Sequence, residues 1–264
     1  MKPDGKDKLR DIQSESDPRN LPINKVGVKD ISYPVLVLDR AAGWQHTVAR
    51  VNMYVDLPHH FRGTHMSRFV EILNRYQGGI SSLNIREILD EMKKQLKAEN
   101  AHFEIEFPYF ITKEAPVSRE RAKMEYACRL KADSYDDFYI LEVRVPVLSL
   151  CPCSREISEY GAHNQRSIIT ITVKAREKVW IEDVVEIAEG SASTDIYSIL
   201  KREDEKFITE KSYDNPMFVE DMVRSAAEKL MRNDRVLWFS VESENMESIH
   251  NHSAYARIEK DMRR

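Results

Sequence analysis

The sequence predicts an α+β fold, in which antiparallel sheets carry helices on one face. Segments of alternating apolar and polar residues surround segments with helical periodicity, so that strands, helices and strands follow in that order. The same order occurs twice, with a boundary near residue 134. The chain has 8 glycines in 264 residues and a hairpin-like spacing of its strand segments, which also favours antiparallel pairing.

The first half is expected to span residues 21–133. Its period-two segments predict strands, and its apolar stripes predict amphipathic helices. Ser81 or Ser82 is available to cap the second helix. Cys128 lies on the apolar face of a strand and is expected to be a plain core residue. The expected elements are strands at 31–38 and 47–57, helices at 69–76 and 83–96, and strands at 103–107 and 121–131.

The second half is expected to span residues 134–264. Its clearest helix has Asp214 or Asn215 as cap and Pro216 in the first turn. The expected elements are strands at 137–147 and 167–175, helices at 181–188, 195–208 and 217–231, and a buried strand at 236–241. Residues 1–20 are almost wholly charged or small polar, which predicts a disordered tail.

The overall composition excludes several classes of protein. The chain has 40 basic and 44 acidic residues, a net charge of −4, which argues against a dedicated binder of nucleic acid or anionic membranes. Neither a signal peptide nor a run of 18 apolar residues is present, so a cytoplasmic protein is expected. Three cysteines in such a chain indicate a metal site or a reactive thiol rather than a disulfide framework.

The strongest chemical signal is Cys151-Pro152-Cys153 with His163 ten residues later. Thiolates and an imidazole are ligands of a soft or borderline metal ion. Because the chain has no second cysteine pair to close a four-ligand cage, an open coordination position and catalysis are expected. The alternatives are two buried thiols at a strand end or a redox-active dithiol.

A third ligand must come from elsewhere, and the run at 201–207 offers three carboxylates, although it could equally be a solvated helix face. Glu220 lies in the first turn of a helix, where it could interact with the dipole or accept two N–H groups of a planar base. His250 and His252 suit acid–base chemistry or an ordinary surface loop. His65 and Arg68 open a helix and suit phosphate oxygens or an ordinary cap.

Longer motifs lie at residues 149–154, 156–158, 160–167, 21–24, 63–69, 204–206, 215–221 and 247–252. These motifs resemble those of the GTP cyclohydrolase type IB family, the bacterial and archaeal alternative to the common zinc GTP cyclohydrolase I. The resemblance implies tandem tunnelling-fold (T-fold) units, assembled as a homotetramer with active sites at subunit interfaces. It also implies conversion of GTP and water into 7,8-dihydroneopterin triphosphate and formate, the first step towards tetrahydrofolate and queuosine-type bases.

The resemblance also assigns roles to single residues. It implies Cys151, His163 and Glu205 as ligands of a divalent metal (Zn, Mn or Fe) in the second half, with no organic cofactor. Cys153 is implied beside the metal. The implied substrate and proton-transfer residues are Glu220 as guanine anchor, His250 and His252 for proton transfer, and His65, Arg68 and Arg166 as further GTP contacts.

Two other functions remain open from the sequence. One is the NADPH-dependent nitrile reductase of queuosine synthesis, which resembles this chain in fold and in using a cysteine. The other is a noncatalytic module in which Cys151, Cys153 and His163 bind a metal that stabilises a loop.

Overall fold

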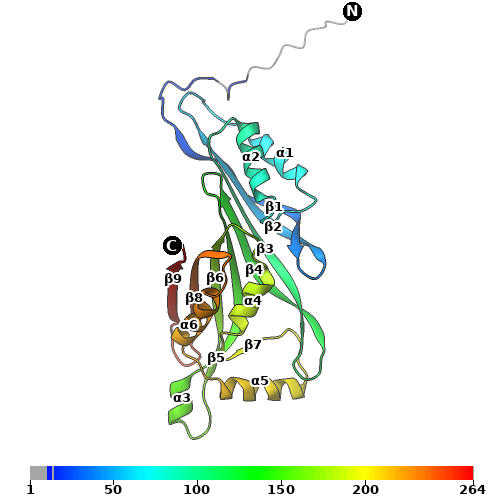
Figure 1. Ribbon diagram of the computed structural model, residues 1–264, viewed down its shortest axis with the longest axis vertical. Coiled ribbons are helices and arrows are strands. Elements are labelled where there is room, and N and C mark those ends of the chain that lie inside the picture. Colours follow the sequence, from blue (N-terminus) through cyan, green and yellow to red (C-terminus); the bar gives the residue numbers. More distant parts are fainter. Residues whose placement is uncertain (1–10, 14, 264) are drawn as a thin grey trace, which may run out of the picture.

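The computed structural model describes residues 11–13 and 15–263. In this part of the chain nine strands form one sheet, in which every neighbouring pair is antiparallel (Figure 1). The order across the sheet is β1-β2-β3-β4-β5-β6-β8-β9, and β7 pairs with β5 off this path. The strands are β1 (Ile23–Asp39), β2 (Gly43–Leu57), β3 (Ala101–Glu114), β4 (Arg121–Asp133), β5 (Tyr139–Leu150), β6 (Asn164–Ala175), β7 (Thr194–Asp195), β8 (Val236–Asn245) and β9 (Ala254–Asp261).

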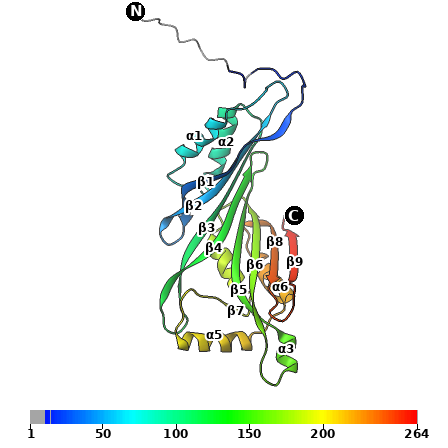
Figure 2. The same cartoon turned by 180° about the vertical axis from the view of Figure 1, so that it is seen from behind.

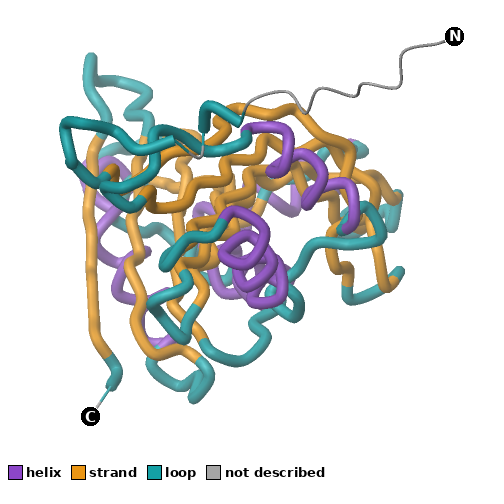
Figure 3. The backbone as a smooth tube through the Cα atoms, turned by 90° about the horizontal axis from the view of Figure 1, so that it is seen from above, coloured by secondary structure: helices purple, strands orange, loops and turns teal. Residues whose placement is uncertain are grey.

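Helices cover one face of this sheet. For example, α4 lies in front of the strands in Figure 1 and behind them in Figure 2. Figure 3 looks along the long axis and shows the strands curving around one side of the helices. The helices are α1 (Met66–Arg75), α2 (Ile85–Leu96), α3 (Pro152–Ile157), α4 (Ile181–Glu189), α5 (Arg202–Asp214) and α6 (Val219–Leu230).

One hydrophobic core lies between the sheet and the helices. Alternate strand residues such as Val51, Met53 and Val173 are fully buried, because every second side chain of a strand points to the same face. The helices contribute apolar stripes, as the period of the sequence predicts. The core runs without interruption from the β2 region to the β8 region, since β4 pairs with β5 and joins the two halves into one sheet. The division into halves at residue 134 stays a prediction.

Several predicted boundaries are wrong. The first strand begins at Ile23 rather than at residue 31. The helix expected from residue 195 begins at Arg202, because Asp195 belongs to β7 and Asp204 accepts a hydrogen bond from the Lys201 N–H group at 2.8 Å, which fixes the start of α5.

The predicted helix caps also differ from the observed ones. Asn84, not Ser81 or Ser82, is the N-cap residue of α2, although Ser81 contacts it by donating its N–H to the Asn84 Oδ1 at 2.9 Å. In the second half Asp214 is the last residue of α5, so it cannot cap α6. The N-cap residue of α6 is Phe218, whose N–H donates to Asp221 in the first turn at 3.1 Å.

The predicted tail at 1–20 falls partly on residues 1–10 and 14, which lie outside the described residues. The described part contacts the loop after β2: Arg62 and Gly63 donate backbone N–H groups to the carbonyl oxygens of Glu15 and Gln13 at 2.8 and 3.1 Å. Among the described residues, no helix is both long and apolar enough to cross a membrane.

Candidate functional site

The pairing of β5 with β6 brings Cys151 and His163 side by side. The ladder ends at the pair Leu150 and Asn164, and the Cys151 N–H then donates to the His163 carbonyl oxygen at 3.1 Å. Cys151 and His163 stand at the two ends of the loop between the strands, and backbone geometry therefore holds them opposite one another.

The short helix α3 fixes the Cys151 side chain. Cys151 is the N-cap residue of α3, and its Sγ accepts the Ser154 N–H at 3.4 Å. The Ser154 hydroxyl donates to the Cys151 carbonyl and accepts the His163 N–H, both at 3.2 Å, so it joins the two candidate ligands. Cys153 is exposed within α3, and among the described residues it has no disulfide partner.

The His163 ring contacts the loop after β8. Its Nδ1 lies 2.9 Å from the Gln165 Oε1 and 3.3 Å from the Ser248 Oγ. The same loop carries His250 and His252, whose exposed rings stack with centroids 5.1 Å apart. The fold thus brings the segment 247–252 next to His163.

The start of α6 lies at the same end of the sheet. The Met217 N–H donates to the Leu150 carbonyl at 3.1 Å, directly before Cys151. Asn215 donates its side-chain N–H groups to the carbonyl oxygens of Ala192 and Ser193 at 3.0 and 3.2 Å, which fixes the approach to the helix. Glu220 therefore projects from the first turn of α6 near the end of β5, and it is exposed.

Glu205 lies apart from Cys151 and His163 within one chain. Near the start of α5, Asp204 binds the turn between β3 and β4, whereas at the other end of the helix the Arg155 guanidinium of α3 lies 4.6 Å from the Tyr213 ring centre. Glu205 precedes Tyr213 by eight residues, about 12 Å along a helix. In the described part of the chain, no group of three or more His, Cys, Asp and Glu side chains is arranged to hold a metal ion.

The other predicted GTP contacts also lie elsewhere. Helix α1, with His65 as its N-cap residue and Arg68 in its first turn, is at the opposite end of the long axis from α3 (Figure 1). The His65 Nε2 lies 3.3 Å from the Asp11 carboxylate, and Arg68 donates to the Gln95 carbonyl at 2.9 Å. Arg166 is exposed on β6, between the buried residues Gln165 and Ser167, and so points to the other face of the sheet.

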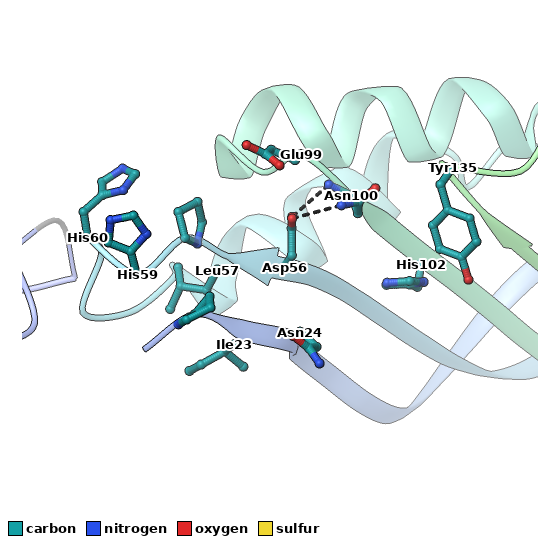
Figure 4. Close-up of a pocket in the computed structure, with 12 residues that line it drawn as sticks. Ile23, Asn24, Asp56, Leu57, His59, His60, Glu99, Asn100, His102 and Tyr135 are labelled. Carbon is teal, nitrogen blue, oxygen red and sulfur yellow. Dashed lines mark hydrogen bonds between the residues drawn. The ribbon is translucent and has the colours of Figure 1, made fainter. Parts of the chain in front are cut away.

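A pocket of about 530 Å³ lies at the α1 end of the molecule (Figure 4). Residues of the 21–24 stretch line it, together with the end of β2 and the start of β3. Asp56 accepts two hydrogen bonds from Asn100, which close one wall. The sequence alone does not single out the pocket's three imidazoles, which belong to His59, His60 and His102.

The polar residues around His163 were also missed at the sequence level. Gln165 is 6% exposed and Ser149 and Ser167 are fully buried. The sequence does hold a signal for them. Gln165 and Ser167 continue the alternation of Ile169, Ile171 and Val173, so they are polar residues at positions that the alternation predicts to be buried.

Known proteins resemble this chain over nearly its whole length. Residues 9–256 match the family model described as type I GTP cyclohydrolase folE2. The protein named GTP cyclohydrolase FolE2 of Geotalea uraniireducens is 61% identical over 97% of this chain and 94% of its own length. The FolE2 proteins of Citrifermentans bemidjiense and Geobacter sulfurreducens are each 59% identical over 97% of this chain, covering 96% and 100% of their own lengths.

Among solved structures, a uricase from Bacillus fastidious has a TM-score of 0.51 and 9% identity over 90% of this chain and 93% of its own. This likeness confirms the predicted tunnelling fold, and it concerns the fold alone. The sequence matches confirm the resemblance found in the motifs and give no support to the nitrile reductase alternative. The chain belongs to the type I GTP cyclohydrolase FolE2 family.

Proposed function

We propose that this protein converts GTP and water into 7,8-dihydroneopterin triphosphate and formate at a metal site that includes Cys151, His163 and Glu205. Relatives about 60% identical over nearly the full chain carry the name GTP cyclohydrolase, which supports the reaction. The backbone pairing of Cys151 with His163 is the single observation that carries the metal site, because it holds a sulfur and an imidazole opposite one another.

The donor set fits a divalent metal. A thiolate, an imidazole and a carboxylate together are compatible with Zn²⁺, Mn²⁺ or Fe²⁺. When bound, such an ion supplies the Lewis acidity that lets water attack C8 of the purine at neutral pH. No organic cofactor is needed for this hydrolysis.

The surrounding residues would bind the substrate and move protons. A Glu220 carboxylate can accept the N1–H and the amino N–H of guanine, whereas adenine has no N1–H to offer. His250 or His252 would donate a proton to the ring nitrogen that leaves C8, since imidazole is a suitable acid at neutral pH. His65, Arg68 and Arg166 are proposed as further GTP contacts, and Cys153 as a neighbour of the metal.

We further propose that a homotetramer forms the complete site at subunit interfaces. A single chain keeps Glu205 away from Cys151 and places His65 at the other end of the long axis, which supports a site completed by a neighbouring copy. Large apolar side chains around the Cys151 end are exposed in one subunit, which supports burial against another: Ile157, Tyr160, Phe218, Met246 and Ile249.

Replacement of Cys151 tests the reaction and the metal site. In the variant Cys151→Ala the rate of formate release from GTP is expected to fall by about a thousandfold or more, because a metal ligand is removed. The matched control is Cys128→Ala, which removes a thiol from the core of β4 and is expected to keep near-normal activity. Formate and the fluorescent pterin product are measured with Zn²⁺, Mn²⁺ and Fe²⁺ in turn; near-normal turnover by Cys151→Ala would reject the site.

Replacement of Glu220 tests guanine recognition. Glu220→Gln keeps the shape but turns one acceptor into a donor, so kcat/KM for GTP should fall by roughly a hundredfold or more. The oligomeric state and metal content should not change. An unchanged kcat/KM would remove Glu220 from the site.

A further inference from the structure

The Gln165 side chain lies between His163 and the loop after β8. Its Oε1 is 2.9 Å from the His163 Nδ1, and its Nε2 donates to the Ser149 Oγ at 2.9 Å and the Glu247 Oε1 at 3.4 Å. Gln165 is 6% exposed, so water does not compete freely for these contacts. Each polar atom of this amide therefore has a protein partner.

The neighbours define which way the amide points. A Glu247 carboxylate oxygen only accepts hydrogen bonds, so the group facing it must be the Gln165 NH₂. The carbonyl oxygen must then face His163, and because that oxygen only accepts, the Nδ1 of His163 must carry the proton. The Ser248 hydroxyl, 3.3 Å from Nδ1, can act as a second acceptor.

We propose that Gln165 is a positioning residue that fixes the tautomer and orientation of His163, so that the lone pair of Nε2 is presented to the metal. This inference rests on the proposed metal-dependent function. A metal-binding histidine needs one ring nitrogen free of its proton and the ring held in place by a hydrogen bond to the other nitrogen. Gln165 lies two residues after His163, so its side chain points to the same face, and its carboxamide oxygen accepts that bond.

The same amide also connects the ligand to the loop that carries His250 and His252. Glu247 accepts from Gln165, and Ser248 contacts His163, so the loop is attached to the ligand at two points. Below Gln165, Ser149 receives a second hydrogen bond from Ser167 at 3.0 Å, within the buried part of the sheet. Gln165 is thus fixed from both sides before a metal arrives.

The test compares Gln165→Met with the wild type, using Ser167→Ala as a matched control. Met keeps the length of the side chain and removes the oxygen that accepts from Nδ1. Ser167→Ala removes a buried hydrogen bond of the same network without touching His163. The dissociation constants of Zn²⁺ and Mn²⁺ are measured by chelator competition, and NMR of the histidine ring nitrogens in the metal-free protein reports the tautomer.

The proposal expects Gln165→Met to bind metal roughly 10–100-fold more weakly and to lose the Nδ1–H tautomer of His163. Ser167→Ala should stay within about threefold of the wild type. High metal concentration should restore part of the GTP turnover of Gln165→Met, because the ligand itself remains.

Two results would overturn the role of Gln165: unchanged metal affinity in Gln165→Met, or an equal loss of affinity in Gln165→Met and Ser167→Ala. The second would mean that any break in the buried network weakens metal binding, without a specific role for the bond to His163. Failure of the proposed reaction would have a different sign: wild-type protein would bind metal but release no formate from GTP. The comparison of metal affinities would still decide the role of Gln165.

Discussion

Asp204 and Glu205 are adjacent in the sequence but differ completely in their surroundings. Asp204 is fully buried and accepts the N–H groups of Val117 and Ser118 at 2.8 and 2.9 Å and the Ser118 hydroxyl at 2.6 Å. Glu205 is exposed. The first carboxylate attaches α5 to the turn between β3 and β4, whereas the second lies at the surface of the subunit.

The pKa of Asp204 leads to a prediction about acid stability. Burial alone would raise this pKa, but hydrogen bonds from Ser118, Lys201 and Val117 outweigh burial and lower the pKa below its ordinary value. A carboxyl with a lowered folded-state pKa stabilises the fold above its unfolded-state pKa, and this contribution is lost as the pH falls below about 4.

Replacement of Asp204 by Asn should therefore lower the Tm of the metal-free protein by roughly 5 °C near neutral pH. The difference from the wild type should shrink as the pH falls to about 3, because the wild type then loses the contribution itself. Melting curves in a chelating buffer measure both values. Glu205→Gln is the control and should not change the Tm; a difference that is constant over the pH range would contradict the argument.

At the scale of elements, a partly buried ion cluster connects β3, α4 and β7. Lys113 on β3 donates to Glu189 at 2.8 Å and to Asp195 at 2.9 Å, and its side chain is 11% exposed. The Tyr126 hydroxyl donates to Glu189 at 2.7 Å. Burial raises the pKa of Glu189, and the attraction of Lys113 opposes that rise.

Removal of the cation should loosen this junction. Lys113→Met removes the cation that Glu189 and Asp195 share. Glu189 then keeps only the Tyr126 hydroxyl, while Asp195 keeps Lys211 at 3.1 Å, so the free energy of unfolding should fall by about 3 kcal/mol. Lys123→Met, an exposed lysine on β4, is the matched control and should change it by less than about 0.5 kcal/mol. Urea denaturation measures both, and an equal effect of the two variants would show that the cluster adds nothing to stability.

The elements that the sequence predicts best are those with strong apolar periodicity. In α6, Met222, Ala226 and Leu230 are buried as their spacing predicts. Helix α5 was misplaced because few of its residues are buried. Its start depends on Asp204, which accepts from Lys201 three residues away but also from Val117 and Ser118, more than eighty residues away. Local patterns cannot contain such long-range contacts.

The same distinction applies to the candidate site. Cys151 and His163 are close in sequence and are joined by one hairpin-like pairing, so their proximity could be inferred from the sequence. The contacts of Gln165 with Glu247 depend on the pairing of β6 with β8, which no spacing reveals. Whether residues at the two ends of the long axis meet in one site depends on how copies of the chain assemble, which no pattern within one sequence contains.

At the scale of the whole molecule, each subunit carries two unlike ends. One end presents Cys151, His163 and Glu220, and the other presents His65 and the pocket lined by His59 and His102. If the active site forms between subunits, the two ends of different copies must meet, and closed symmetry gives every copy the same pair of contacts. An oligomer that mixes a variant inactivated at one end with a variant inactivated at the other end should then regain activity.

Coexpression of Cys151→Ala with His65→Ala tests this arrangement. Each variant alone should release little formate, whereas mixed oligomers should regain about a quarter of wild-type activity, because an interfacial site is intact only when each end comes from the variant that keeps it. The control is coexpression of Cys151→Ala with His163→Ala, which alter the same end of one subunit and should give no rescue. Formate release is measured on mixed oligomers purified with a different tag on each variant. Failure of the first pair, with both variants present in the same oligomer, would mean that His65 and Cys151 do not share a site.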